Sequence, residues 1–98
     1  MSQTHEHILD VSTLAAPEPL LLTLAAVEKL QQGEFLRMHH RMQPCHLYAE
    51  LERRGYAHDT RRIQGGFCQV FIWRRHDALA ETSAMQIAKS MTAWPMSA

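Results

Sequence analysis

The sequence predicts an α/β fold: a two-layer α/β sandwich with the element order β-α-β-α-β-β, a four-stranded mixed sheet and an additional C-terminal helix. Short apolar strand-like segments alternate with segments whose apolar residues recur at helical spacing. Glycines and prolines stand at the boundaries between them. The chain has 98 residues, of which 46% are hydrophobic and 20% charged, as is typical of one globular domain. Helices that follow the first two strands predict parallel pairing early in the chain and an antiparallel edge late.

Residues 7–11 form the first predicted strand. Pro17 and Pro19 predict the start of the first helix, because the amide hydrogen that proline lacks would have no partner in a first helical turn. Apolar residues then recur every three or four positions through residues 20–31, and Gly33 marks the expected stop.

Residues 34–40 form the second predicted strand, with Leu36 and Met38 on the side that faces the core. The second helix is expected over residues 45–54, and Gly55 is placed to end it. Two further strands follow, separated by a turn with two glycines. Their ranges are 56–63 and 67–73, and they predict an antiparallel hairpin.

The last of these strands is apolar on both faces, which two helices on one side of a sheet cannot cover. Residues 83–94 offer a cover, because Ser83 and Gln86 match a capping box and the apolar residues after Ser83 fall at helical spacing. We expect this third helix either to pack on the second face or to mediate a homodimer. A disordered tail is the alternative.

The predicted organisation is an N-terminal tail over residues 1–6, a domain over 7–75 and a C-terminal helical segment or tail over 76–98. The longest apolar run, residues 20–27, is interrupted by Thr23 and is too short to span a membrane. The N-terminus has acids and histidines where a signal peptide has basic and apolar residues, so we expect a cytoplasmic protein without membrane partners.

The net charge is zero, but all eight arginines lie between Arg37 and Arg75, a stretch with only three acids. We interpret them as solvated residues at element ends rather than as a binding patch. Phe67, Phe71 and Trp73 could stack on RNA bases if their face of the sheet were open. A C-terminal helix on that face would close it, so a nucleic-acid partner is not expected.

Several short motifs resemble the TusA/SirA-like sulfur-carrier superfamily over residues 8–74. They are the strand with Leu-Asp at 8–11, the Pro-Glu-Pro of residues 17–19 and the Gly-Glu turn that opens 33–36. In that superfamily a Cys-Pro-x-Pro motif begins the first helix and its cysteine carries sulfur. Here Ala16 stands at the cysteine position, and a methyl group cannot form a thiolate or persulfide. Ordinary sulfur relay through that position is therefore excluded. Residues 42–48 and 51–55 resemble a cysteine-lacking branch of uncharacterised domains, which implies a fold and not a reaction.

Reactive side chains gather at the end of the second strand and the start of the next helix. His39 and His40 should point to opposite faces, so a metal site would have three ligands, His40, Cys45 and His46. A fourth ligand would be present only if His5 or His7 contributed. The alternative is that these are ordinary surface and boundary histidines. No cofactor is required by the sequence.

Cys45 admits two interpretations. It opens a helix beside His46, which favours a reactive thiolate, so it could be a displaced sulfur or redox thiol. The other interpretation is a partly exposed cysteine without a role. Cys68 alternates with apolar residues and is expected in the core.

No phosphate loop, nucleophile elbow or paired carboxylates are present, so an enzyme is not expected. The sequence predicts a non-enzymatic binding or accessory domain with a protein partner, and with the outer sheet face or C-terminal helix available for a homodimer. Its ligand or partner site is expected at the carboxyl edge of the sheet. The residues of this edge are Ala16, Pro17, Glu18, Pro19, His40, Cys45 and His46.

Overall fold

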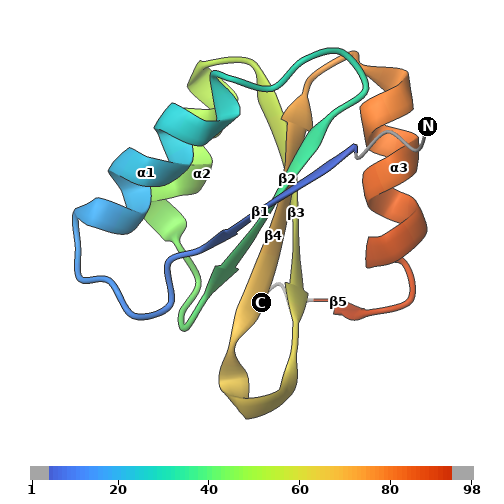
Figure 1. Cartoon of the computed structure of the whole chain (residues 1–98). Coiled ribbons are helices and arrows are strands. Elements are labelled where there is room, and N and C mark those ends of the chain that lie inside the picture. Colours follow the sequence, from blue (N-terminus) through green and yellow to red (C-terminus); the bar gives the residue numbers. More distant parts are fainter. Residues whose placement is uncertain (1–4, 94–98) are drawn as a thin grey trace.

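Three helices and a five-stranded mixed sheet make up the described part of the chain, which confirms the predicted α/β sandwich (Figure 1). The structure, a computed structural model, describes residues 5–93. A short 3₁₀ turn, Gln64–Gly66, joins β3 to β4. The other elements are β1 (Glu6–Asp10), α1 (Glu18–Val27), β2 (Phe35–His40), α2 (Cys45–Arg53), β3 (Tyr56–Arg62), β4 (Cys68–Arg74), α3 (Ala78–Ala88) and β5 (Thr92–Ala93).

The strands lie in the order β1-β2-β4-β3-β5. β1 runs parallel to β2, with Glu6 opposite Phe35 and Asp10 opposite His39. β4 is antiparallel to both of its neighbours, as the predicted hairpin requires. The fifth strand was not predicted: β5 has two residues and pairs with the end of β3. Two residues are too few to show the alternation by which a strand is recognised.

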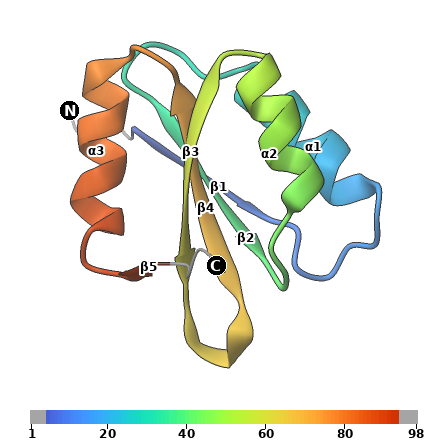
Figure 2. The same ribbon diagram turned by 180° about the vertical axis from the view of Figure 1, so that it is seen from behind.

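The first face of the sheet is covered by α1 and α2, which lie side by side in Figure 2. Leu36 and Met38 of β2 are buried there, as predicted, together with Cys68 of β4. Leucines and valines of the two helices complete this core. The face that carries Leu36 also carries His40, two residues beyond Met38, because side chains alternate along a strand.

The second face is covered by α3, so the packing alternative for the C-terminal helix is the one observed (Figures 1 and 2). The helix presents three alanines, each without exposed surface, to the aromatic rings of the sheet. Those rings belong to Phe35, Phe71 and Trp73. Phe71 and Trp73 are therefore unavailable as stacking platforms for bases.

The predicted bounds of two helices were wrong. α3 begins at Ala78 rather than near Ser83, and Ser83 lies inside the helix. The true N-cap is Asp77, whose carboxylate accepts a hydrogen bond from the amide of Ala80 at 3.1 Å. α1 ends at Val27 instead of continuing to residue 31. α3 also ends at Ala88, and β5 follows it, so the helix does not continue toward residue 94 as predicted.

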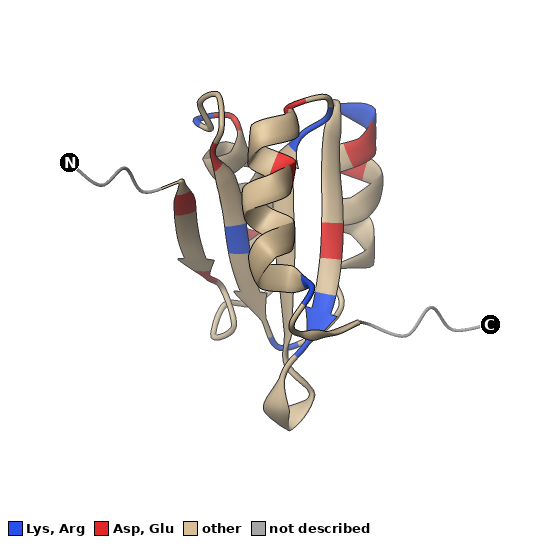
Figure 3. Ribbon diagram, turned by 90° about the vertical axis from the view of Figure 1, so that its right-hand side faces the viewer, with Lys and Arg blue, Asp and Glu red and all other residues tan. Residues whose placement is uncertain are grey.

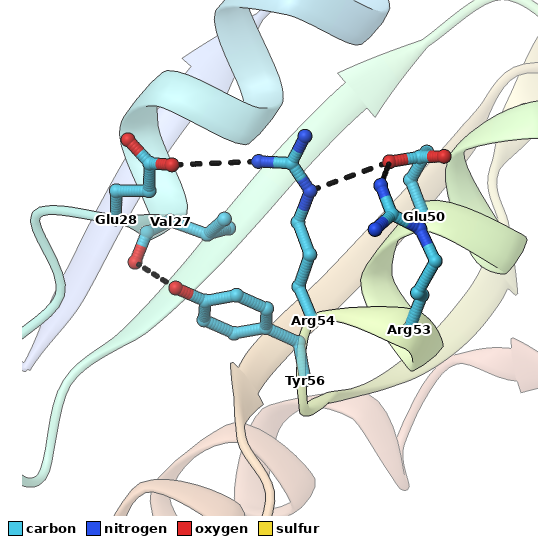
Figure 4. A network of polar contacts seen from close by, with 6 residues as sticks. All are labelled: Val27, Glu28, Glu50, Arg53, Arg54 and Tyr56. Carbon is cyan, nitrogen blue, oxygen red and sulfur yellow. Dashed lines mark hydrogen bonds and ion pairs between the residues drawn. The ribbon is translucent and has the colours of Figure 1, made fainter.

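A polar network joins the end of α1 to α2 and to the start of β3 (Figure 4). Arg54 donates to Glu50 within its own segment and to Glu28, the residue after α1, at 3.4 Å. The hydroxyl of Tyr56 donates to the carbonyl of Val27. These bonds tie the C-terminal end of α1 to α2 and β3.

Several arginines of the basic stretch contact carboxylates, and residues of both signs are interspersed on the α3 side (Figure 3). Arg37 pairs with Glu6 at 3.1 Å, and Arg61 pairs with Asp59 at 2.6 Å. These contacts fit the interpretation of a solvated surface. Among residues 5–93 no helix has the length and apolar character that crossing a membrane requires.

Candidate functional site

A pocket of about 370 Å³ opens at the carboxyl end of β2, between the β1–α1 loop, the start of α1 and the start of α2. Its position follows from the fold, because β1 and β2 are parallel and the segments after them reach the same edge of the sheet. Its apolar wall consists of Leu14, Pro19, Leu20, Met38, Met42 and Leu47. The polar lining residues are His40, Arg41, Gln43, Cys45 and His46.

Six of the seven residues expected at this edge line the pocket, namely Ala16, Pro17, Pro19, His40, Cys45 and His46. Glu18 does not line it and is exposed in the first turn of α1. Adjacent residues of a helix point about 100° apart, so Glu18 faces away from the wall formed by its neighbours. The structure thus brings together residues from two segments more than twenty positions apart.

His40 is the most deeply buried polar residue of the pocket, with 6% of its surface exposed. Its Nδ1 is buried and has no hydrogen-bond partner among the described residues. Burial, followed by the positive charges of Arg41 and His39, lowers the pKa of His40 below the ordinary value of 6.5. The imidazole is therefore neutral at neutral pH, with one nitrogen able to donate and the other able to accept.

Cys45 is the first residue of α2, and its thiol is free and exposed. Its amide donates to the carbonyl of Gln43 at 3.1 Å. Cys68 is also a free thiol, but it is buried in the core, as expected, and its Sγ donates to the carbonyl of Met42. Burial raises the pKa of Cys68 to about 11, so this thiol stays protonated and inert.

The structure does not assemble a metal site from His40, Cys45 and His46. Within residues 5–93 no three His, Cys, Asp or Glu side chains are grouped closely enough to hold a metal ion. His39 lies on the opposite face, as predicted, and stacks on Phe67 with ring centroids 5.3 Å apart. His7 pairs with Glu34 at the other end of β1 and cannot supply a fourth ligand. Metal binding stays a prediction without a ligand set in the described part of the chain.

A second polar cluster, between α2 and β3, was missed by the sequence analysis. The ring of Tyr48 stacks on His58 with centroids 4.5 Å apart, and its hydroxyl shares a hydrogen bond with Thr60. His58 Nε2 lies 2.9 Å from a carboxylate oxygen of Glu52. Burial raises the pKa of the Tyr48 hydroxyl above its ordinary value of 10.0. The sequence did contain a signal for this cluster. Tyr48 and Glu52 lie one helical turn apart, and polar residues alternate along the strand that follows.

The two helices that flank the pocket begin without a side-chain cap, and the amides of Glu18, Cys45 and Leu47 instead donate to nearby backbone carbonyls. The N-cap residues are Pro17 for α1 and Pro44 for α2, and neither helix has a side chain that caps its first amides. By contrast, Asp10 is engaged just before the pocket, where it accepts hydrogen bonds from the hydroxyl and amide of Ser12. The Ser12 hydroxyl and then its amide lower the pKa of Asp10, which stabilises the loop that leads to α1.

Comparisons with known proteins identify the fold. The sequence profile of a family described as an uncharacterized conserved protein (DUF2249) matches residues 8–74. The fold is similar to that of a SirA-like protein from Desulfitobacterium hafniense, with a TM-score of 0.60 and 18% sequence identity over 66% of this chain and 92% of the other. No curated protein matches the sequence. The predicted resemblance to the SirA-like superfamily is confirmed at the level of the fold.

Proposed function

The chain belongs to the DUF2249 family, and we propose that it acts as a non-enzymatic binding domain of SirA-like fold whose binding site is the pocket between the starts of α1 and α2. The observation that carries this proposal is the pocket itself, which gathers six of the predicted edge residues around a mainly apolar wall. Concave, mainly apolar sites with a few convergent polar groups are typical of ligand binding.

The resemblance to sulfur carriers supports a binding role over a carrier role at this place. The position of the carrier cysteine is Ala16, which lines the pocket. A methyl group leaves the cavity in place but offers no nucleophile. In the sulfur carriers this edge of the sheet is the expected reaction site, and in this chain we infer that it serves to bind a ligand.

The test is to map where small molecules bind to the full chain. A chemically mixed fragment library is added to ¹⁵N-labelled protein, and amide shifts are recorded for the wild type and for Ala16→Leu, whose larger side chain fills the pocket. Ala25→Leu is the matched control, because Ala25 is exposed on α1 and lies outside the pocket. We expect hits to shift residues 14–20 and 40–47 and to be lost only in Ala16→Leu. Hits elsewhere, or hits that survive this substitution, would overturn the proposal.

A second candidate function is a sulfur or redox relay through Cys45, favoured by its exposed free thiol at the pocket. In such a relay the Cys45 thiolate attacks the outer sulfur of a donor persulfide, the donor S–S bond breaks, and the donor leaves as a thiolate. Native mass spectrometry of untagged protein, purified without chelator or reductant, measures this directly. An increment of one sulfur that disappears in Cys45→Ser supports the relay, and a bare mass after incubation with a persulfide donor contradicts it. The same spectrum reports any bound metal.

A further inference from the structure

The charged groups around the pocket favour a negatively charged ligand. None of the described residues that line it is Asp or Glu, whereas Arg41 and His46 both lie at its lining. α2 begins beside the pocket without a side-chain cap and without an acid in its first turn, whereas α1 carries Glu18 in its first turn. The first amides of a helix and its macrodipole attract anions, and a basic side chain nearby adds to this effect.

His40 supplies an independent reason to expect a polar group inside the pocket. Its ring is nine-tenths buried, and its Nδ1 is without a partner among the described residues. Buried polar atoms in folded proteins are almost always hydrogen-bonded, and one left unpaired costs about 1–3 kcal/mol. The ring of His40 also lines the pocket, where its neutral form can donate one hydrogen bond to a ligand oxygen.

The rest of the wall is suited to a small apolar body. Leu20, Met38 and Leu47 face the space from α1, β2 and α2. The volume of about 370 Å³ lies near the lower end of the range for small-molecule sites. A ligand for this pocket therefore combines one anionic group with a compact apolar portion.

We propose that the pocket binds a small organic carboxylate, whose carboxylate accepts a hydrogen bond from His40 near Arg41 and the start of α2, and whose apolar body packs on Leu20 and Met38. This inference rests on the proposed binding function and names its ligand class. A free acid is favoured over a protein segment because the volume of about 370 Å³ matches that of a small-molecule site. Charge-assisted hydrogen bonds in an apolar setting supply the specificity.

The test compares two probes of nearly the same shape, benzoate and benzamide, titrated into the full ¹⁵N-labelled chain. We expect benzoate to shift the amides of residues 14–20 and 40–47 and to bind about tenfold more tightly than benzamide, as one charge-assisted hydrogen bond implies. Equal affinity of the two probes would overturn the carboxylate proposal. If neutral fragments still map to the pocket, the proposed binding function stands while this inference fails.

Variants separate the role of His40 from that of the cavity. His40→Leu keeps an apolar side chain at a buried position, and we expect it to weaken benzoate binding about tenfold and to leave benzamide binding within about twofold. His39→Leu, on the other face of β2, is the matched control and should change neither. Arg41→Gln should weaken benzoate binding by a few-fold, with less effect in high salt. Unchanged benzoate affinity in His40→Leu would overturn the proposal.

A further titration, with peptides, distinguishes a free acid from a protein C-terminus as the source of the carboxylate. A short peptide that ends in leucine and its C-terminally amidated form are titrated in the same way. Binding of the free peptide more tightly than benzoate, with loss on amidation, would assign the pocket to a protein C-terminus and overturn the free-acid proposal. Weaker binding than benzoate supports it.

Discussion

The two faces of the sheet are built on different principles. Under α3, three alanines meet three aromatic rings, and each of these six residues is at most 6% exposed. Under α1 and α2, the core consists mainly of leucines and valines and stops short of the carboxyl edge, where the pocket and His40, with its unpartnered Nδ1, lie. Close packing stabilises, whereas unfilled space and unpaired polar atoms cost stability and are typical of binding sites. The α3 face is thus the structural face, and the edge of the other face is the candidate site.

The strongest test of this contrast is Phe71→Ala on the α3 face. Phe71 has no exposed surface and packs near Phe35, with ring centroids 6.1 Å apart. Its removal leaves a cavity, and we expect the free energy of unfolding to fall by about 3–5 kcal/mol. Urea unfolding measures this change. The matched substitution at the pocket is Met42→Ala, at a side chain that is 54% exposed, and it should change stability by no more than about 0.5 kcal/mol. Similar losses for the two variants would remove the distinction between the faces.

Asp77→Ala tests how α3 is held at its first turn. The Asp77 carboxylate accepts from the amide of Ala80 and, at 2.9 Å, from the amide of Gly33 before β2. Loss of a cap together with this second bond should lower the free energy of unfolding by about 1–2 kcal/mol. Thermal unfolding measures the change. Asp77→Asn is the comparison variant: it has one acceptor oxygen in place of two and can keep only one of the two bonds, so we expect it to lose about half as much stability as Asp77→Ala.

Much of the division between the faces could be predicted from the sequence. Alternation in β2 and β4 assigned Leu36 to one face and Phe71 to the other, and the apolar character of both faces of β4 predicted a covering helix. His40 and Cys45 were placed at the site edge because the carboxyl ends of parallel strands meet there. These are inferences from local periodicity and topology, which a single sequence carries.

Other features depend on tertiary contacts that no local pattern records. The start of α3 is set by Asp77, which bonds to Gly33 forty-four residues earlier. The stacking of Tyr48 on His58 depends on how α2 lies across β3. The lack of a partner for His40 Nδ1 is known only after every neighbour has been placed.

The pH dependence of stability tests the contribution of His40 on the pocket side of the sheet. The pKa of His40 is lowered in the folded protein, so between that value and 6.5 the unfolded chain binds a proton that the folded chain does not. The free energy of unfolding contributed by His40 is therefore complete above pH 6.5 and is lost as the pH falls through the folded-state pKa. We expect His40→Leu to be less sensitive than the wild type to acid between pH 6.5 and 5. Urea unfolding across this range measures it. His39→Leu, which keeps His40, should retain the sensitivity, and a parallel loss in both variants would assign the effect elsewhere.

The smallest expected effect concerns a second unpaired polar atom on the same side of the sheet, the hydroxyl of Thr23 in α1. Thr23 has no exposed surface, and its Oγ1 has no partner among the described residues. Thr23→Val keeps the shape and removes the buried hydroxyl, so we expect the free energy of unfolding to rise by about 0.5–1 kcal/mol, measured by urea unfolding. Thr82→Val, at an exposed position of α3, is the control and should bring no such gain. A loss of stability in Thr23→Val would mean that this hydroxyl is hydrogen-bonded in solution. The α1 side of the sheet would then have one unsatisfied polar group fewer, which would weaken its contrast with the α3 face.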